Sequence, residues 1–316
     1  MLAIIEFTLP FWHSSIDTTI CDSGSVCVGG YSKFIPRFGF IPTKGTHSSR
    51  KITSSGEVIY DVIYTIGDDG YRKDNTSEFY NVYIYGGSYT FGEGLNDNET
   101  ISYYLAKNYN INSKNYGIHG YGLHQALFTL GSKVEITDNG INILLTFPLH
   151  SLRSSCKVGY SAKSPRYIIQ DESLKLHGVC PGGGIFSRII SKSKIVELIK
   201  QIFIYKNIKI TDEDINLYFK IIEEIAKLTK QKNSKLIIAY IDATDEQLTD
   251  TSWTNKLIFE RMESITNTVI DTTLADSFEE LPNHLYIHEL DKHPSAKANK
   301  ERARLISNAI RKINLN

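Results

Sequence analysis

Short apolar runs and amphipathic stretches alternate along the chain from about residue 80 to its end. Buried strands are predicted at residues 80–86, 114–118, 141–149, 235–243, 267–271 and 284–288. Helices are predicted at about 98–109, 122–131, 191–205, 211–232 and 253–263, with a closing helix from about Pro294. Because strands that alternate with helices form parallel sheets covered on both faces, we expect a three-layer α/β/α sandwich with a mainly parallel sheet of about five strands.

Two segments interrupt this alternation. Residues 1–78 are rich in Gly, Ser and Thr and contain short β-type runs, such as 57–66 before a turn at 67–70. Residues from about 150 to 187 contain two short β-like runs and a glycine cluster, which indicate an excursion or hairpin over the domain and a candidate wall of a substrate cleft. The expected organisation is a β-containing N-terminal extension at 1–78 and an α/β domain at 79–316.

The charge balance narrows the range of partners. Lys and Arg total 35, Asp and Glu also total 35, and no basic block carries interleaved aromatic residues. A nucleic-acid surface needs such a block, so nucleic acid is not expected as a partner. With 41% hydrophobic residues among 316, the chain can bury a substantial core.

The cysteines leave two alternatives open. Cys21, Cys27, Cys156 and Cys180 lack C-x-x-C spacing and neighbouring clustered histidines, which argues against a structural zinc site. Their even number permits the disulfides Cys21–Cys27 and Cys156–Cys180 in an oxidising compartment. Four free thiols in a cytosolic protein are an equal alternative.

The apolar beginning of the chain, MLAIIEFTLPFW, has two interpretations. It contains Glu6 and Pro10, lacks a basic start, and is too short to span a bilayer. It fits the remainder of a signal or anchor segment, or an ordinary strand. No transmembrane segment is expected, and the possible disulfides together with this start favour an extracytoplasmic location, periplasmic or secreted, over a cytoplasmic one.

Ser88 lies between glycines and aromatic residues where the first predicted strand gives way to helical sequence, in NVYIYGGSYTFGEGLND. Backbone N–H groups at such a turn lack partners and favour negative charge, which suits an oxyanion beside a nucleophilic serine. A serine nucleophile also needs a base and an acid that orients the base. Without such partners, Ser88 would be an ordinary turn residue.

Two later stretches can supply these partners. NYGIHGYGLHQAL at 115–127 repeats the strand-to-glycine-to-helix pattern. Since neighbouring carboxyl-end loops of a parallel sheet meet at one crevice, Gly120 is a candidate oxyanion donor. HELDKHPSAKANKERARLI at 288–306 places Asp291 and His293 on a predicted loop ahead of the closing helix, where an acid and an imidazole can complete a triad.

These three stretches resemble the blocks of the SGNH, or GDSL-like, hydrolases. GGSYTFGEGLND is similar to the block that displays the nucleophile, NYGIHGYG to the block with the oxyanion glycine, and LDKHPSAKAN to the last block, with Asp, His and Pro. The likeness covers the chain from about residue 80 to its end. It implies a flavodoxin-like fold, Ser88 as nucleophile, His293 as general base and Asp291 as its orienting acid, without a metal or organic cofactor.

The chain departs from the pattern of the family at two places. The family spaces the acid and histidine as Asp-x-x-His, whereas Asp291 and His293 are one residue closer, and Glu289 is a reserve candidate for the acid. The oxyanion asparagine of the third block is absent from LLTFPLHSLRSS. His150 lies at about that location and could donate through its ring, with Arg153 as a second candidate.

The expected function is hydrolysis of an acyl ester, of short acetyl type, on a carbohydrate or lipid. The oxyanion would be held by the N–H groups of Ser88 and Gly120 and by His150. Transfer of the acyl group to a sugar hydroxyl by the same residues is one alternative. A non-catalytic binding or assembly module of the same fold, favoured by the missing asparagine, is the other.

Overall fold

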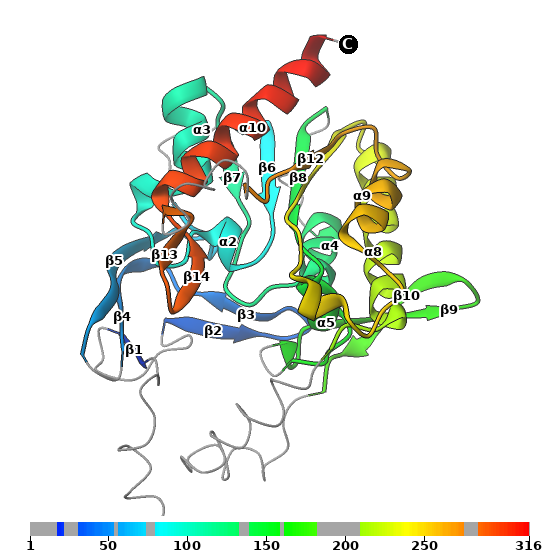
Figure 1. Cartoon of the computed structure of the whole chain (residues 1–316), viewed down its shortest axis with the longest axis horizontal. Helices are drawn as coiled ribbons and strands as arrows, with labels where there is room; N and C mark the ends of the chain where they lie inside the picture. The colour runs from blue at the N-terminus through cyan, green and yellow to red at the C-terminus, as the bar shows by residue number, and fades with distance from the viewer. Residues whose placement is uncertain are drawn as a thin grey trace, which may run out of the picture.

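A five-stranded parallel sheet lies at the centre of the computed structural model, which describes residues 18–21, 31–53, 56–73, 80–132, 139–158, 161–181, 209–274 and 284–315. Its strands are β6 (Val82–Tyr85), β7 (Ser113–Asn115), β8 (Ile141–Thr146), β11 (Lys235–Tyr240) and β12 (Val269–Asp271). They lie in the order β12-β11-β8-β6-β7 (Figure 1). Counted along the chain this order is 2-1-3-4-5, the flavodoxin-like arrangement, so the expected fold class is confirmed.

Helices cover both faces of this sheet (Figure 1). One face is covered by α3 (Ile101–Tyr109) and α10 (Ala296–Leu315). The other is covered by α4 (Leu123–Ser132), α5 (Leu149–Ser154), α8 (Asp212–Gln231) and α9 (Asn255–Glu263). Because successive side chains of a strand point to opposite faces, Val82 and Ile84 pack toward α3 and α10, whereas Tyr83 and Tyr85 pack toward α4 and α8. The two apolar layers make β6 fully buried.

The last predicted strand and the start of the closing helix differ from the sequence expectation. Residues 286–288 form β13 (Tyr286–His288), which pairs with β14 (Asp291–Pro294) in an antiparallel hairpin outside the central sheet. The helix begins at Ala296 because the hydroxyl of Ser295 accepts the N–H of Ala298 and caps it. Pro294 ends β14 instead of opening the helix, so that prediction was wrong, as was the loop predicted for Asp291 and His293.

Several other predicted elements are shorter than expected, two of them for a reason that the structure shows. The strand predicted at 141–149 ends at Thr146, and Pro148 precedes α5. The helix predicted at 98–109 is divided into the 3₁₀ turn η2 (Asp97–Glu99) and α3, because the hydroxyl of Thr100 accepts the N–H of Tyr103 and starts a new helix. The helix predicted at 191–205 lies outside the described residues.

Two small antiparallel sheets are formed by the N-terminal residues. The first contains β1 (Thr18–Cys21), β4 (Gly45–Ile52) and β5 (Val58–Ile66), and the second is the hairpin of β2 (Ser32–Ile35) and β3 (Gly39–Pro42). Tyr64 of β5 packs edge-on against Phe91, whose ring centroid is 5.1 Å away. The N-terminal strands therefore share a core with the segment that follows Ser88. A domain division at 78/79 stays a prediction.

A third hairpin, of β9 (Pro165–Gln170) and β10 (Ser173–Val179), projects beside α8 (Figure 1). The disulfide Cys156–Cys180 joins the end of α5 to the end of this hairpin, so the second of the two possible pairings is present. Cys27, a partner in the other pairing, lies outside the described residues. Within the described ranges, no helix has the length and apolarity to cross a membrane.

Candidate active site

Ser88 lies at the topological switch point of the sheet. It follows β6 and opens the one-turn helix α2 (Ser88–Phe91), while the neighbouring strand β8 leads into α5. In flavodoxin-like sheets the crevice at the carboxyl ends of these two strands is the common ligand site. Gly87 lets the turn fit there, since a Cβ at that position would lie 2.6 Å from Nη1 of Arg153 and 2.9 Å from the carbonyl oxygen of Tyr121.

His293 contacts both Ser88 and Asp291. Nε2 of His293 is 2.9 Å from Oγ of Ser88, and Nδ1 of His293 is 2.5 Å from Oδ1 of Asp291. The carboxylate can only accept, so Nδ1–H donates to Asp291 and leaves the Nε2 lone pair to accept the Ser88 hydroxyl. This is the polarity that a general base needs. Asp291 is buried, whereas the reserve acid Glu289 is exposed.

The shortened Asp-x-His spacing follows from the strand that carries it. Asp291 and His293 are two residues apart on β14, and side chains two apart on a strand point to the same side. The backbone N–H of His293 also donates to Oδ1 of Asp291, at 3.0 Å. One intervening residue is therefore enough on this strand to bring the Asp291 carboxylate to the His293 imidazole.

Lys51 of β4 and Glu93, just after α2, complete the charged surroundings of His293. Nζ of Lys51 is 2.8 Å from Oδ2 of Asp291, and Oε2 of Glu93 is 3.3 Å from Nε2 of His293. Burial raises the pKa of Asp291, but His293 and then Lys51 outweigh it and hold that pKa below its usual range. Burial lowers the pKa of His293, but Glu93 and Asp291 outweigh it and raise that pKa above 6.5. Neither Lys51 nor Glu93 was predicted from the sequence as a residue of the site.

His119 and His124, which flank Gly120, lie in different surroundings. Nδ1 of His119 is 2.7 Å from Oε2 of Glu93, next to the contact with His293. His124 is buried and contacts Oγ of Ser164 at 2.8 Å through Nε2. Burial lowers the pKa of His124 to about 3 and keeps it neutral, which fits a structural role.

His150 reaches the turn that carries Ser88. A Cβ added at Gly87 would lie 3.2 Å from Nε2 of His150, so the ring is next to this turn. The same nitrogen is buried and has no hydrogen-bond partner among the residues that the structure describes. Nδ1 of His150 is 3.0 Å from Oγ1 of Thr146. Burial, then the charge of Arg153, lowers the pKa of His150 far below 6.5, so the ring is neutral.

The loop with Gly120 is held against the same turn. The N–H of Ile118 donates to the carbonyl of Gly86, and Nη1 of Arg153 donates to the carbonyl of Tyr121 at 2.8 Å. Gly120 itself has a φ of +69°, in the left-handed region that glycine adopts at little cost. Arg153, the alternative to His150 as an oxyanion donor, thus anchors the loop that carries Gly120.

The solved structures to which this chain is similar include esterases and lipolytic proteins. The psychrotrophic esterase EstA from Pseudoalteromonas sp. is 12% identical, with a TM-score of 0.43 over 75% of this chain and 100% of that chain. A member of the lipolytic protein G-D-S-L family from Veillonella parvula DSM 2008 is 14% identical, with a TM-score of 0.38 over 73% of this chain and 96% of that chain. An acetyl xylan esterase, Est2A, from the rumen bacterium Butyrivibrio proteoclasticus is 11% identical, with a TM-score of 0.39 over 94% and 83%.

No protein-family model matches the sequence, and no curated protein is similar to it. These TM-scores are all below 0.5. The strand order of the central sheet defines the fold, and the contacts of Ser88 define the candidate site.

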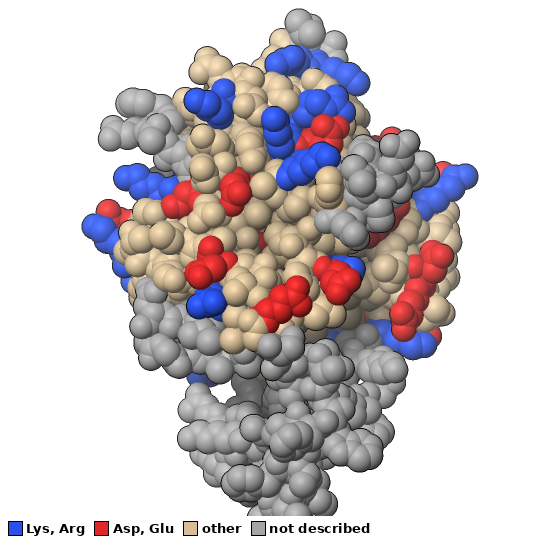
Figure 2. Space-filling model, turned by 60° about the vertical axis from the view of Figure 1, so that its left-hand side comes forward, with Lys and Arg blue, Asp and Glu red and all other residues tan. Residues whose placement is uncertain are grey.

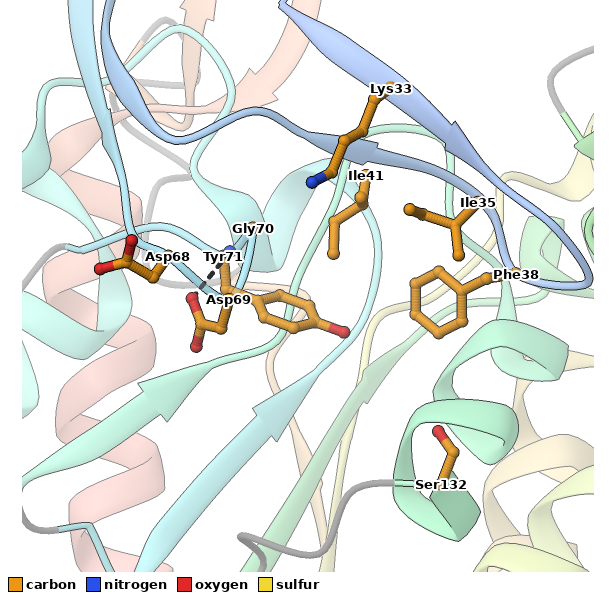
Figure 3. A pocket seen from close by; sticks show the side chains of 9 residues that line it. All are labelled: Lys33, Ile35, Phe38, Ile41, Asp68, Asp69, Gly70, Tyr71 and Ser132. Atoms are coloured by element: carbon orange, nitrogen blue, oxygen red, sulfur yellow. Dashed lines mark hydrogen bonds between the residues drawn. The ribbon is translucent and has the colours of Figure 1, made fainter.

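A separate cavity of about 260 Å³ lies beneath the β2–β3 hairpin. Figure 3 shows the side chains of Ile35, Ile41 and Phe38 on one side of it, with Asp69 and Tyr71 across from them. None of the sequence-predicted site residues lines this cavity.

In the ranges that the structure describes, no group of His, Cys, Asp and Glu has the arrangement of a metal site. On the face in Figure 2, Lys and Arg occur side by side with Asp and Glu.

Proposed function

We propose that this protein is a serine esterase in which Ser88, His293 and Asp291 form the catalytic triad. The observation that carries the proposal is the chain of contacts from Oγ of Ser88 through His293 to a buried carboxylate, at the carboxyl end of β6. A lone serine is a weak nucleophile, and a base oriented by an acid is the device that activates it.

In the proposed reaction, Nε2 of His293 accepts the proton of Ser88 as Oγ attacks the ester carbonyl. The bond from Oγ to the carbonyl carbon forms, and the carbonyl π electrons move onto its oxygen. The imidazolium then gives its proton to the leaving alcohol as the C–O bond breaks. Water, deprotonated by the same imidazole, releases the acyl group from Ser88. Asp291 keeps the imidazole in the tautomer that makes both proton transfers possible.

Three groups support the oxyanion in this proposal. Ser88 is the first residue of α2, so its N–H has no partner within the helix. Gly120 lies on the loop that Arg153 holds beside the nucleophile. The neutral ring of His150 supplies Nε2, in place of the asparagine of the family that the chain resembles. Donors aimed in advance at a developing negative charge are the strongest single contribution to such reactions.

The substrate class that we propose is a short, acetyl-type ester of a carbohydrate or lipid. Aromatic rings next to the site support it: Tyr89 lies 5.6 Å from the ring of His293 and 5.2 Å from the ring of Phe147, which in turn lies 4.2 Å from His150. A cluster of this kind presents flat apolar surface to a sugar ring or a small acyl group.

The test of the proposed function is turnover of p-nitrophenyl acetate by the parent protein and by Ser88→Ala. We expect Ser88→Ala to lose about four orders of magnitude in kcat or more, and to resist labelling by a fluorophosphonate that modifies the parent. Ser173→Ala, which changes an exposed serine on β10, is the matched control and should behave as the parent. Equal rates for the parent and Ser88→Ala would rule out the proposed triad. Analysis of the acyl products formed with and without a sugar acceptor separates hydrolysis from acyl transfer.

A further inference from the structure

The imidazole of His293 lies between two carboxylates, only one of which belongs to the proposed triad. Asp291 contacts Nδ1, and Oε2 of Glu93 lies 3.3 Å from Nε2, the nitrogen that also contacts Ser88. The side chains of His293 and Glu93 are 22% and 23% exposed, so the pair is largely shielded from water. At this distance and burial a carboxylate strongly favours the protonated imidazole.

A directed chain of hydrogen bonds keeps Glu93 ionised and in place. The hydroxyl of Tyr31 lies 2.5 Å from Nε2 of His119, and Nδ1 of His119 lies 2.7 Å from Oε2 of Glu93. Burial raises the pKa of Tyr31, so its hydroxyl keeps its proton and donates to His119, whose other nitrogen then donates to the carboxylate. Burial raises the pKa of Glu93, but His293 and His119 outweigh it and lower that pKa to about 2.

The backbone at Glu93 is fixed as firmly as its side chain. The N–H of Glu93 donates to the carbonyl of Ser88 at 3.0 Å, which ties it to the nucleophile. The buried guanidinium of Arg72 donates to the carbonyls of Phe91 and Gly92, the two preceding residues. With the backbone fixed, the carboxylate can swing away from Nε2 only by breaking its hydrogen bond to His119.

We propose that Glu93 is a positioning residue of the site, whose carboxylate stabilises the imidazolium that His293 becomes when Ser88 transfers its proton to Nε2. This inference rests on the proposed function. Glu93 forms and breaks no covalent bond. It supplies a second acceptor for the N–H that Nε2 gains, until that proton passes to the leaving alcohol.

Lys51 opposes Glu93 in this arrangement. Among the described residues, three titratable groups lie directly beside His293: Asp291 on β14, Glu93 after α2 and Tyr89 on α2. Lys51 on β4 acts on His293 through its ion pair with Asp291. The hydroxyl of Tyr89 stays neutral because burial raises its pKa to about 12. Glu93 and Asp291 raise the pKa of His293, and Lys51 lowers it. Glu93 and Lys51, together with Asp291, therefore set the pH at which His293 becomes an unprotonated base.

The experiment is an NMR titration of the His293 imidazole in the parent, Glu93→Gln and Lys51→Met, with the His293 signal assigned from His293→Gln. We expect Glu93→Gln to lower the pKa of His293 by about one unit and Lys51→Met to raise it. The midpoint of the acid limb of kcat/KM should move in the same directions. Glu260→Gln, which changes an exposed carboxylate on α9, is the matched control and should leave the titration unchanged.

Opposite shifts in the two variants are a result that a merely structural role does not produce. If neither variant moves the pKa of His293 by more than about 0.3 unit, the inference is overturned, even where the activity of Glu93→Gln has fallen. Because the titration needs no turnover, it is separate from the Ser88→Ala assay. Failure of the proposed function appears in that assay, and failure of the charge arrangement appears in the NMR titration.

Discussion

Replacing His150 tests whether a histidine takes the place of an oxyanion asparagine. His150 is buried to 1% exposure and its Nε2 has no hydrogen-bond partner among the described residues. On the other side of the ring, Nδ1 lies 3.0 Å from Oγ1 of Thr146, which lies 3.0 Å from the hydroxyl of Tyr218. If Tyr218 donates to Thr146 and Thr146 donates to Nδ1, the neutral ring carries its proton on Nε2. A buried donor aimed at the turn of Ser88 then has no acceptor until an oxyanion forms.

The size of the expected effect follows from this arrangement. An unpaired buried N–H lowers the stability of the free protein, and it regains a charged acceptor only when the carbonyl oxygen becomes negative. Removing one donor of this kind lowers kcat by about 10²- to 10³-fold, which corresponds to about 2.7–4 kcal/mol of transition-state stabilisation. The loss should fall on kcat more than on KM, because the contact strengthens only in the transition state.

His150→Phe removes the donor and keeps a ring of similar shape, whereas His150→Gln keeps an N–H near the position of Nε2. We expect His150→Phe to lose about 10²- to 10³-fold in kcat on p-nitrophenyl acetate and His150→Gln to lose about tenfold or less. Thermal unfolding of both variants checks that the fold is retained. A kcat of folded His150→Phe within about threefold of the parent would refute the oxyanion role.

Three further outcomes are expected. The acid limb of kcat/KM should have its midpoint above pH 6.5, because the pKa of His293 is raised in the folded protein and activity appears only as the imidazole loses its proton. A pH–rate profile with a midpoint below 6 would contradict this. Replacing Cys156 and Cys180 by Ser should lower the free energy of unfolding by about 3 kcal/mol, since the bridge closes a loop with a sequence separation of 24; unchanged denaturant unfolding would contradict it. Gly86→Ala should lower the free energy of unfolding by about 2 kcal/mol in denaturant unfolding, because the added Cβ would lie 2.8 Å from the carbonyl oxygen of Leu145. An unfolding midpoint equal to that of the parent would show that the turn has room for the methyl group.

Local patterns in the sequence were enough to predict the fold class and the candidate triad. The period of apolar residues separates strands from helices, and their alternation predicts the parallel sheet that the structure shows. The glycines before Ser88 predict a turn at the end of a strand, and the structure places α2 there. Asp291 and His293 are neighbours in the chain and were paired on that ground, while their catalytic roles stay a prediction.

Local patterns failed where a contact between distant segments decides the structure. Residues 291–293 contain no long apolar run, and the sequence predicts a loop for them, yet pairing with β13 makes Asp291–Pro294 a strand. Glu93 lies only five residues after Ser88, so its nearness to the nucleophile could have been noticed from the sequence. Its contact with His293 could not, because that histidine is distant in the chain.

What the sequence by itself determined is therefore the layered α/β architecture and the choice of a serine, a histidine and an acid as the candidate triad, because periodicity, turn chemistry and short spacing act over a few residues. Only the tertiary structure decided the charge around His293. Lys51 and Asp291 are separated by 240 positions, and Tyr31 and His119 by 88. An ion pair or hydrogen bond between such residues leaves no periodic trace along the chain, since it exists only after the N-terminal strands have packed against the segment that follows Ser88.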